Sequence, residues 1–265
     1  MPSDPLEADP MRFCLLASGS KGNCLWIEEG GVAIIIDNGL SLSELKSRVK
    51  KRNLDFKSLA AVFLTHEHSD HMSGVGVLCR AYGLTLHTSP LTLNAAYDGI
   101  GKVDFSPIVS GETVKIGPLV VSAFSSSHDS VDSQVYVIRG SNSSLGMATD
   151  LGVVTHLVRQ NFLSLTALVL EFNHDLKMLL KGPYPLFLKQ RVRSRRGHLS
   201  NADASVFLSQ VNHSGLKLVV LSHLSETNND PLLALSAAKE AISKGPGKPK
   251  IQAANQWEPT PVFEI

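Results

Sequence analysis

The chain is poor in the features that mark several classes of protein. It has only three cysteines among 265 residues, Cys14, Cys24 and Cys79, and none of them forms a Cys-x-x-Cys pair. This sparse, odd set argues against a disulfide framework and a cysteine-based metal site, and it favours a reducing compartment, the cytoplasm. Because the net charge is only +1, no global charge excess points to nucleic acid or to a membrane surface.

Long apolar runs are also missing, since no stretch approaches the roughly 18 residues that are needed to cross a bilayer. The first ten residues carry three prolines and three acids. They lack the basic start and the apolar run of a signal peptide. We therefore expect a disordered tail over residues 1–10, a single folded domain over 11–265 and no membrane partner, whereas the sequence leaves the oligomeric state open.

The chain does contain an alternation of short strands and helices. The apolar patterns predict strands over residues 12–17, 23–28, 32–37, 61–64, 119–121, 135–138, 168–170 and 218–221, and helices over 42–52, 72–82 and 231–243. Both halves are rich in strands first and mixed afterwards. This order favours two sheets packed face to face with helices outside, a four-layer α/β/β/α sandwich.

The segment His66-Glu67-His68-Ser69-Asp70-His71 follows an apolar strand directly. Because alternate residues of an extended chain point the same way, His66 and His68 can bind one metal ion while Asp70 and His71 turn toward a second. Imidazole and carboxylate ligands suit zinc, manganese or iron. The alternative is a surface loop that is merely rich in histidine. The zincin motif His-Glu-x-x-His does not apply, because residue 70 is Asp and the segment leaves a strand.

Other candidate ligands stand where apolar strands end. Asp37 follows three isoleucines, His128 ends a run of serines, Asp150 follows residues 146–149, and His223 follows the strand at 218–221. A single polar residue at such a place is usually a turn residue. Together with the histidine-rich segment, the four form a set.

In this order the set resembles the five motifs of the metallo-β-lactamase superfamily. The resemblance implies the α/β/β/α fold and two divalent metal ions. It assigns His66, His68 and His128 to the first ion and Asp70, His71 and His223 to the second, with Asp150 bridging them and Asp37 steadying the cluster from outside. The flavodiiron branch of the superfamily has Glu at the place of His68, which disfavours a redox function.

A closer resemblance is to the YycJ-type bacterial exonucleases, also called WalJ or VicX. The segments that carry it are 11–23, 171–175, 196–201 and 259–261. The similarity covers nearly the whole chain except the first ten residues. It implies a 5′-to-3′ exonuclease that acts on DNA with two zinc or manganese ions, iron being a third option.

The chemistry of such a centre agrees with that implication. Two cations about 3.5–4 Å apart can hold a hydroxide between them and clamp a phosphoryl oxygen. The leading hypothesis is therefore a dinuclear phosphodiesterase with Asp70 among its catalytic residues. The alternatives are a thioester or lactone hydrolase of the same fold, and a non-catalytic binding protein.

Glu171 and His198 are further catalytic candidates. The order Asp150, Glu171, His198, His223 resembles that of the tRNA 3′-processing endonucleases of this fold, in which a Glu and a His at matching places form a proton-donating pair. The resemblance implies that His198, steered by Glu171, is the general acid. The alternative is that His198 lies at a helix start and only contacts phosphate.

Substrate contacts are expected around the same segments. Residues 189–196 hold five positive charges and no acid, so Arg191, Arg193, Arg195 and Arg196 are either phosphate contacts or a solvated face. We also expect Asn173, His174 and Ser200 at the substrate pocket, although His174 could instead cap a helix beside Asp175. His87, His156 and His213 have no partner signal and are interpreted as structural or surface residues.

Overall fold

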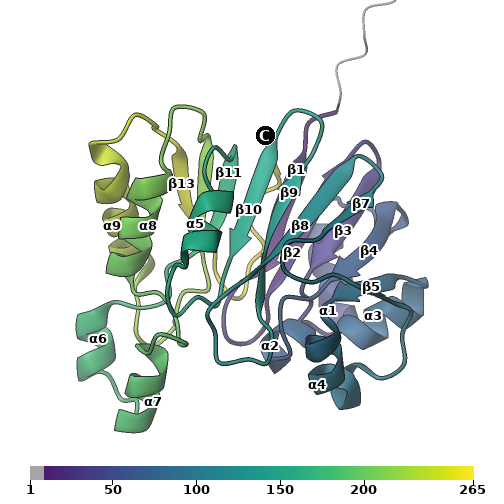
Figure 1. Cartoon of the computed structure of the whole chain (residues 1–265), viewed down its shortest axis with the longest axis horizontal. Coiled ribbons are helices and arrows are strands. Elements are labelled where there is room, and N and C mark those ends of the chain that lie inside the picture. Colours follow the sequence, from purple (N-terminus) through teal and green to yellow (C-terminus); the bar gives the residue numbers. More distant parts are fainter. Residues whose placement is uncertain (1–8) are drawn as a thin grey trace, which may run out of the picture.

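The computed structural model describes residues 9–265, so the first eight residues of the expected tail lie outside the described part. Two seven-stranded sheets face each other (Figure 1). The first has the order β14 (Phe263–Glu264), β1 (Arg12–Ala17), β2 (Cys24–Glu29), β3 (Val32–Ile36), β4 (Leu59–Phe63), β5 (Thr85–Thr88), β6 (Phe105–Pro107). The second has the order β13 (Lys250–Ala253), β12 (Leu218–Ser222), β11 (Ala167–Glu171), β10 (Ser144–Ala148), β9 (Gln134–Arg139), β8 (Leu119–Ser125), β7 (Thr113–Ile116).

Helices cover the outer face of each sheet. Those beside the first sheet are α1 (Leu42–Lys51), the single turn α2 (Ser69–Met72), α3 (Val75–Tyr82) and α4 (Pro90–Ile100), with the 3-10 turn η1 (Phe56–Ser58). Those on the side of the second sheet are α5 (His156–Asn161), α6 (Leu176–Lys181), α7 (Leu186–Val192), α8 (Asn201–Val211) and α9 (Pro231–Ser243).

The core consists of three apolar layers. Alternate residues of the strands, such as Phe13 and Leu15 of β1 and Val121 and Ala123 of β8, meet between the two sheets. The residues between them, such as Cys14, face the outer helices instead. A matching layer lies between the second sheet and α5, α8 and α9. The predicted four-layer α/β/β/α sandwich is thereby confirmed.

Most predicted elements lie within a few residues of their observed bounds, and the helix at 231–243 coincides with α9. The helix predicted over 72–82 is wrong at its start, because the chain forms α2 and then α3, with Gly74 between them. A Cβ on Gly74 would lie 1.9 Å from the carbonyl oxygen of Leu40, so the chain passes close to another loop there. Asp70 and His71, expected on a loop, lie in α2.

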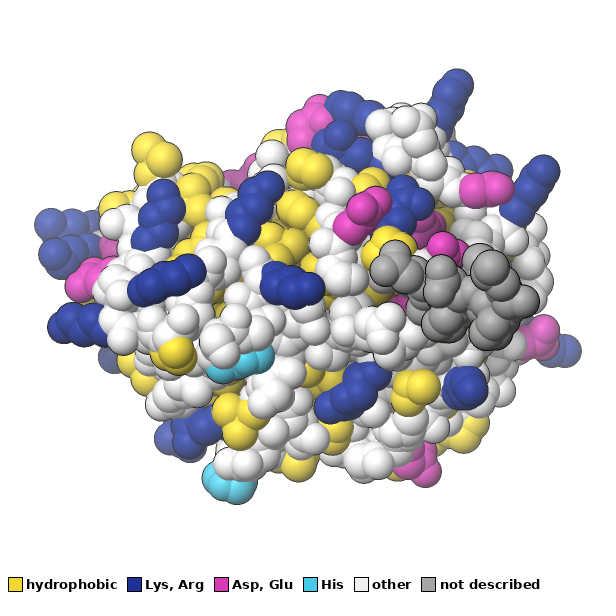
Figure 2. Space-filling model, turned by 90° about the horizontal axis from the view of Figure 1, so that it is seen from above, with side chains coloured by type: hydrophobic (Ala, Val, Ile, Leu, Met, Phe, Trp, Pro, Cys, Tyr) yellow, Lys and Arg dark blue, Asp and Glu magenta, His cyan; other side chains and the backbone are white. Residues whose placement is uncertain are grey.

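The candidate site residues lie at or just after the ends of β3, β4, β8, β10, β11 and β12, and α2, α6 and α7 lie at this same end of the molecule in Figure 1. Figure 2 shows the opposite end of the molecule, where basic, acidic and apolar side chains are interspersed. Within residues 9–265, no helix is long and apolar enough to cross a membrane.

Candidate active site

Three of the candidate residues turn the chain sharply just after a strand. Asp37, Asp150 and His223 have φ angles of 59°, 57° and 54°, in the left-handed region. Asp and His are among the non-glycine residues that tolerate this conformation best, yet it still costs about 1–3 kcal/mol at each position. These turns direct side chains from both sheets to one place, so the strained backbone lies at the candidate site.

Three imidazoles converge on the first position. The Nε2 atom of His66 lies 3.0 Å from Nδ1 of His68, and Nε2 of His128 lies 3.2 Å from the same atom. The Nδ1 atom of His128 donates to the carbonyl of Gly197, so its Nε2 carries the lone pair. The three nitrogens could therefore act as ligands of one ion.

A second group gathers around His71. Its Nδ1 atom donates to Asp37 at 2.8 Å, while its Nε2 atom faces Asp70 at 3.5 Å and Asp150 at 3.2 Å. The Nε2 atom of His223 also faces Asp70, at 3.6 Å. Asp37 is held in turn by the backbone N–H and the hydroxyl of Thr65. Asp37 thus links His71 to Thr65 outside the group of candidate ligands.

Asp150 lies between the two groups, and its buried Oδ2 atom lies 3.2 Å from His71 Nε2 but makes no hydrogen bond of good geometry. A buried carboxylate oxygen of this kind is costly unless something pairs with it. The donor set of imidazole nitrogens and carboxylate oxygens is the set that zinc, manganese and iron prefer. The residues therefore fit divalent metal ions.

The pKa values follow the same division. Burial, and then the neighbouring His71, hold the pKa of His66 well below its usual range, so its ring is neutral and offers a lone pair. Burial alone would also lower the pKa of His71, but Asp150, Asp37 and Asp70 outweigh it and raise that pKa well above the usual range. The second position thus concentrates negative charge, which suits a cation.

Glu171 is fully buried at the end of β11 and joins three loops. Its Oε2 atom accepts the N–H groups of Leu151 and Leu199, and its Oε1 atom accepts His198 Nδ1 at 2.8 Å and His223 Nδ1 at 3.0 Å. Burial would raise its pKa, but the two imidazoles outweigh burial and lower it to about 2. Ionised Glu171 therefore accepts the Nδ1 proton of His198 and leaves its Nε2 atom free.

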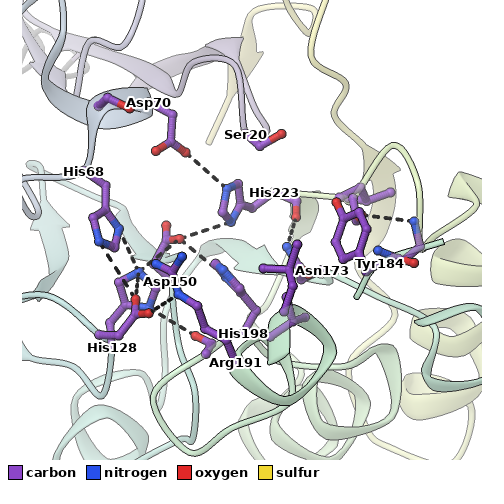
Figure 3. A pocket seen from close by; sticks show the side chains of 18 residues that line it. Ser20, His68, Asp70, His128, Asp150, Asn173, Tyr184, Arg191, His198 and His223 are labelled. Atoms are coloured by element: carbon purple, nitrogen blue, oxygen red, sulfur yellow. Dashed lines mark hydrogen bonds and ion pairs between the residues drawn. The ribbon is translucent and has the colours of Figure 1, made fainter. Parts of the chain in front are cut away.

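A cavity of about 340 Å³ opens over these groups (Figure 3). His198, Asn173 and Arg191 line it, as does Asp129, which forms an ion pair with Arg191 at 2.5 Å. Among the lining residues that sequence reasoning missed are Asp129, Tyr184, Leu188 and Asn228. The position of Asp129 directly after His128 is the only sequence feature that could have indicated its place in the cavity. Tyr184 and Leu188 reach the cavity through the placement of α7, which no local pattern indicates.

The four arginines of the basic run separate in the structure. Arg191 enters the active-site cavity. Arg196 donates to the carbonyls of His128 and Ser130, so its guanidinium holds the loop of a candidate ligand. Arg193 and Arg195 line a neighbouring cavity. The run is therefore not a single uniform phosphate contact.

The other expected substrate residues also take different places. Asn173 lines the active-site cavity and donates to the carbonyl of His223. His174 and Ser200 are buried and line a smaller cavity on the far side of His198. The cap of α6 is Asp175, whose side chain accepts the N–H of Met178, so His174 is not the capping residue.

The remaining histidines lie outside both ligand groups. His87 stacks on Phe63 with ring centroids 4.8 Å apart. His213 contacts the carbonyl of Leu165 at 3.0 Å, and His156 is exposed in α5. The structure thus brings none of the three to the candidate metal positions.

The glycine-rich turn at 18–23 positions two of the candidate ligands. The side-chain amide of Asn23 donates to Asp70 Oδ2 at 3.1 Å, and its backbone N–H donates to the Asp70 carbonyl. The hydroxyl of Ser18 accepts the N–H of His223 at 2.7 Å. Both residues belong to a segment that carries the family resemblance, and the structure shows what they contact.

Replacing Asp37 with asparagine is expected to weaken metal binding by about 10–100-fold, the usual effect of removing a partner that orients a metal-binding histidine. Competition with a chromogenic chelator measures the affinity. Asp104→Asn is the control, because Asp104 is exposed and belongs to neither ligand group. Equal affinities in the two variants would show that Asp37 does not orient His71 for metal binding.

Comparison with known proteins agrees with this geometry. The sequence model of the β-lactamase superfamily domain matches residues 33–224. Exodeoxyribonuclease YycJ of Bacillus anthracis is 34% identical over 237 residues, covering 88% of this chain and 90% of that protein. Exodeoxyribonuclease WalJ of Streptococcus pneumoniae serotype 2 is 36% identical over 228 residues, covering 84% and 85%.

The fold has solved counterparts as well. The metallo-β-lactamase fold protein YhfI from Bacillus subtilis superposes with a TM-score of 0.73 at 17% identity, covering 97% of this chain and 100% of that one. At this identity the likeness concerns the fold alone. Taken with the family match and the two relatives, the chain belongs to the metallo-β-lactamase superfamily of hydrolases, within the family of YycJ and WalJ.

Proposed function

We propose that the protein is a dinuclear metal-dependent phosphodiesterase that degrades DNA from the 5′ end. The observation that carries the proposal is that two ligand groups and the hydrogen-bonded His198–Glu171 pair meet at one cavity. The names of the YycJ and WalJ relatives support the substrate class. We further propose a cytoplasmic location and a single domain over residues 11–265, in keeping with three free, buried cysteines.

The two metal positions are assigned to the side chains described above. His66, His68 and His128 would hold the first ion, Asp70, His71 and His223 the second, and Asp150 both. Zinc or manganese fits the donor set, and iron is also compatible. When bound, the pair of ions would lower the pKa of the attacking water and neutralise charge on the phosphoryl oxygens.

The chain's own residues would supply the remaining chemistry. Hydrolysis forms a bond between water oxygen and phosphorus and breaks the bond from phosphorus to the sugar 3′ oxygen, which must take up a proton. His198 lines the cavity and Glu171 binds its Nδ1 atom, so Nε2 is the nitrogen that would donate that proton. Arg191, paired with Asp129 at the cavity wall, can approach a phosphate oxygen.

The proposal predicts metal-dependent release of nucleotides from the 5′ end of DNA. Stripped protein is reloaded with zinc or manganese and given duplex DNA labelled at either end, the matching RNA and a thioester. We expect stepwise loss of the 5′ label and no turnover without added metal. Faster turnover of the thioester than of DNA would instead support the alternative of a small-molecule hydrolase.

A further inference from the structure

A second cavity, of about 310 Å³, lies beside the active site and is rich in arginine. Arg159 of α5 and Arg193 and Arg195 of the turn after α7 line it, above apolar side chains that include Leu199 and Val206. A smaller cavity of about 240 Å³ shares several lining residues with it, Arg193 among them, and reaches His198. His198 also lines the active-site cavity, so the smaller cavity shares lining residues with each of the other two.

The three guanidinium groups are available for a ligand. Within residues 9–265, the side chains of Arg159, Arg193 and Arg195 make no ion pair or hydrogen bond with the protein, and the Nε atom of Arg159 is buried without a partner. In the same region Arg191 is paired with Asp129. The one acid that lines the cavity, Asp203, accepts the hydroxyl of Ser200. A net excess of positive charge therefore faces this space.

Backbone contacts hold the arginine turn against the loops that carry the candidate metal ligands. A Cβ on Gly152, two residues after Asp150, would lie 2.3 Å from the carbonyl carbon of Arg195, so the two backbones are in direct contact. The hydroxyl of Ser127 donates to the Arg195 carbonyl at 2.7 Å, and the N–H of Gly152 donates to the Ser127 carbonyl. The loops that carry Asp150 and His128 thus also carry this cavity.

We propose that the cavity binds the 5′-terminal phosphate of the strand that is degraded. The inference rests on the proposed function, because it needs His198 to protonate the 3′ oxygen of the departing nucleotide. That nucleotide must then lie next to His198, and Arg193 joins the small cavity at His198 to the cavity that Arg159 and Arg195 line. A terminal phosphate carries a charge of about −1.5 to −2 near pH 7, which is more negative than an internal diester. A guanidinium group can bind two of its oxygens at once through two parallel hydrogen bonds.

The test compares two DNA duplexes that differ only in a 5′ phosphate or a 5′ hydroxyl. Binding to metal-loaded protein is measured by fluorescence anisotropy with methylenephosphonate linkages that cannot be cleaved, and kcat/KM is measured with ordinary linkages. We expect the native protein to prefer the phosphorylated end about tenfold or more, the usual effect of charge-assisted hydrogen bonds. Arg159→Ala and Arg193→Ala should each reduce this preference to below about threefold.

Arg139→Ala is the matched control and should keep the full preference. Arg139 is exposed and lies at the end of β9 that points away from the active site. The other end of the strand is the one near the site, because the N–H of Gln134 there donates to the carbonyl of Thr65, the neighbour of His66. An equal loss of affinity for both duplexes in the Arg159 and Arg193 variants would assign these residues to internal phosphates and overturn the proposal. Binding that discriminates between the ends, without cleavage of either DNA by metal-loaded protein, would instead refute the proposed function alone.

Discussion

Replacement of His198 by alanine is expected to slow the hydrolysis of DNA by roughly 10²–10⁴-fold, the usual contribution of a general acid. The hydrolysis of bis(p-nitrophenyl) phosphate should stay nearly unchanged. The physical reason is the leaving group: a sugar alkoxide is strongly basic and needs a proton as it departs, whereas p-nitrophenolate does not. Measurement of kcat for both substrates, with metal content checked in the same preparation, separates the chemical step from metal binding.

The position of His198 decides how the two substrates should respond to this replacement. His198 lines the cavity and belongs to neither the His66–His68–His128 group nor the Asp70–His71–His223 group. It does lie within reach of Asp150 and His223, so the metal content of the variant must be measured. Its Nδ1 atom is 2.8 Å from Glu171, so Glu171→Gln should reproduce part of the effect on DNA by weakening the orientation of the ring. Equal slowing of both substrates by His198→Ala, with full metal content, would show that His198 positions the phosphate and does not donate the proton.

The gathering of the candidate ligands at one site could be predicted from sequence because their signals are local. His66, His68, Asp70 and His71 stand within six residues directly after a strand, and few other roles demand that density. His223 was recognisable for a related reason, since a polar residue after an apolar strand lies at a sheet edge. What the sequence did not show is the left-handed turn at Asp37, Asp150 and His223, because that conformation depends on the loops that pack around each residue.

The division of the basic run could not be predicted. Arg193 and Arg196 are the same residue type three positions apart, yet one faces a cavity and the other donates to the carbonyls of His128 and Ser130. The difference comes from contacts with residues more than sixty positions away, which leave no local pattern. Tyr184 was missed for the same reason, because it reaches the active-site cavity only through the placement of α6 and α7.

The same distinction between local and distant contacts bears on Glu171. The sequence placed it at a strand end, but its four hydrogen bonds link the loops after β10 and β12 with the turn before α8. One carboxylate thus supports both a candidate metal ligand, His223, and the candidate acid, His198. A defect at Glu171 should therefore affect metal binding and proton transfer together, whereas a defect at His198 should affect proton transfer alone.

Loss of the Asp70 carboxylate should affect metal binding first, in contrast to loss of His198. Asp70→Ala is expected to lower the metal content from about two ions per chain toward one and to reduce activity on both DNA and the p-nitrophenyl diester by more than about 10²-fold. Loss of a mere supporting partner already costs 10–100-fold, and Asp70 faces His71 and His223 directly. Elemental analysis of metal-saturated protein, with the thermal midpoint as a check on folding, measures the effect.

Glu67→Gln is the matched control, because it changes a carboxylate of the same six-residue segment that points elsewhere. Glu67 Oε1 accepts the N–H of Val131 at 2.8 Å, and glutamine can keep that bond. The control should bind two ions and retain activity. If Asp70→Ala also retained two ions, or if saturated native protein held only one, the assignment of Asp70, His71 and His223 to a second ion would be wrong. The bridging position of Asp150 would then lose its basis, since only one ion would remain for it to contact.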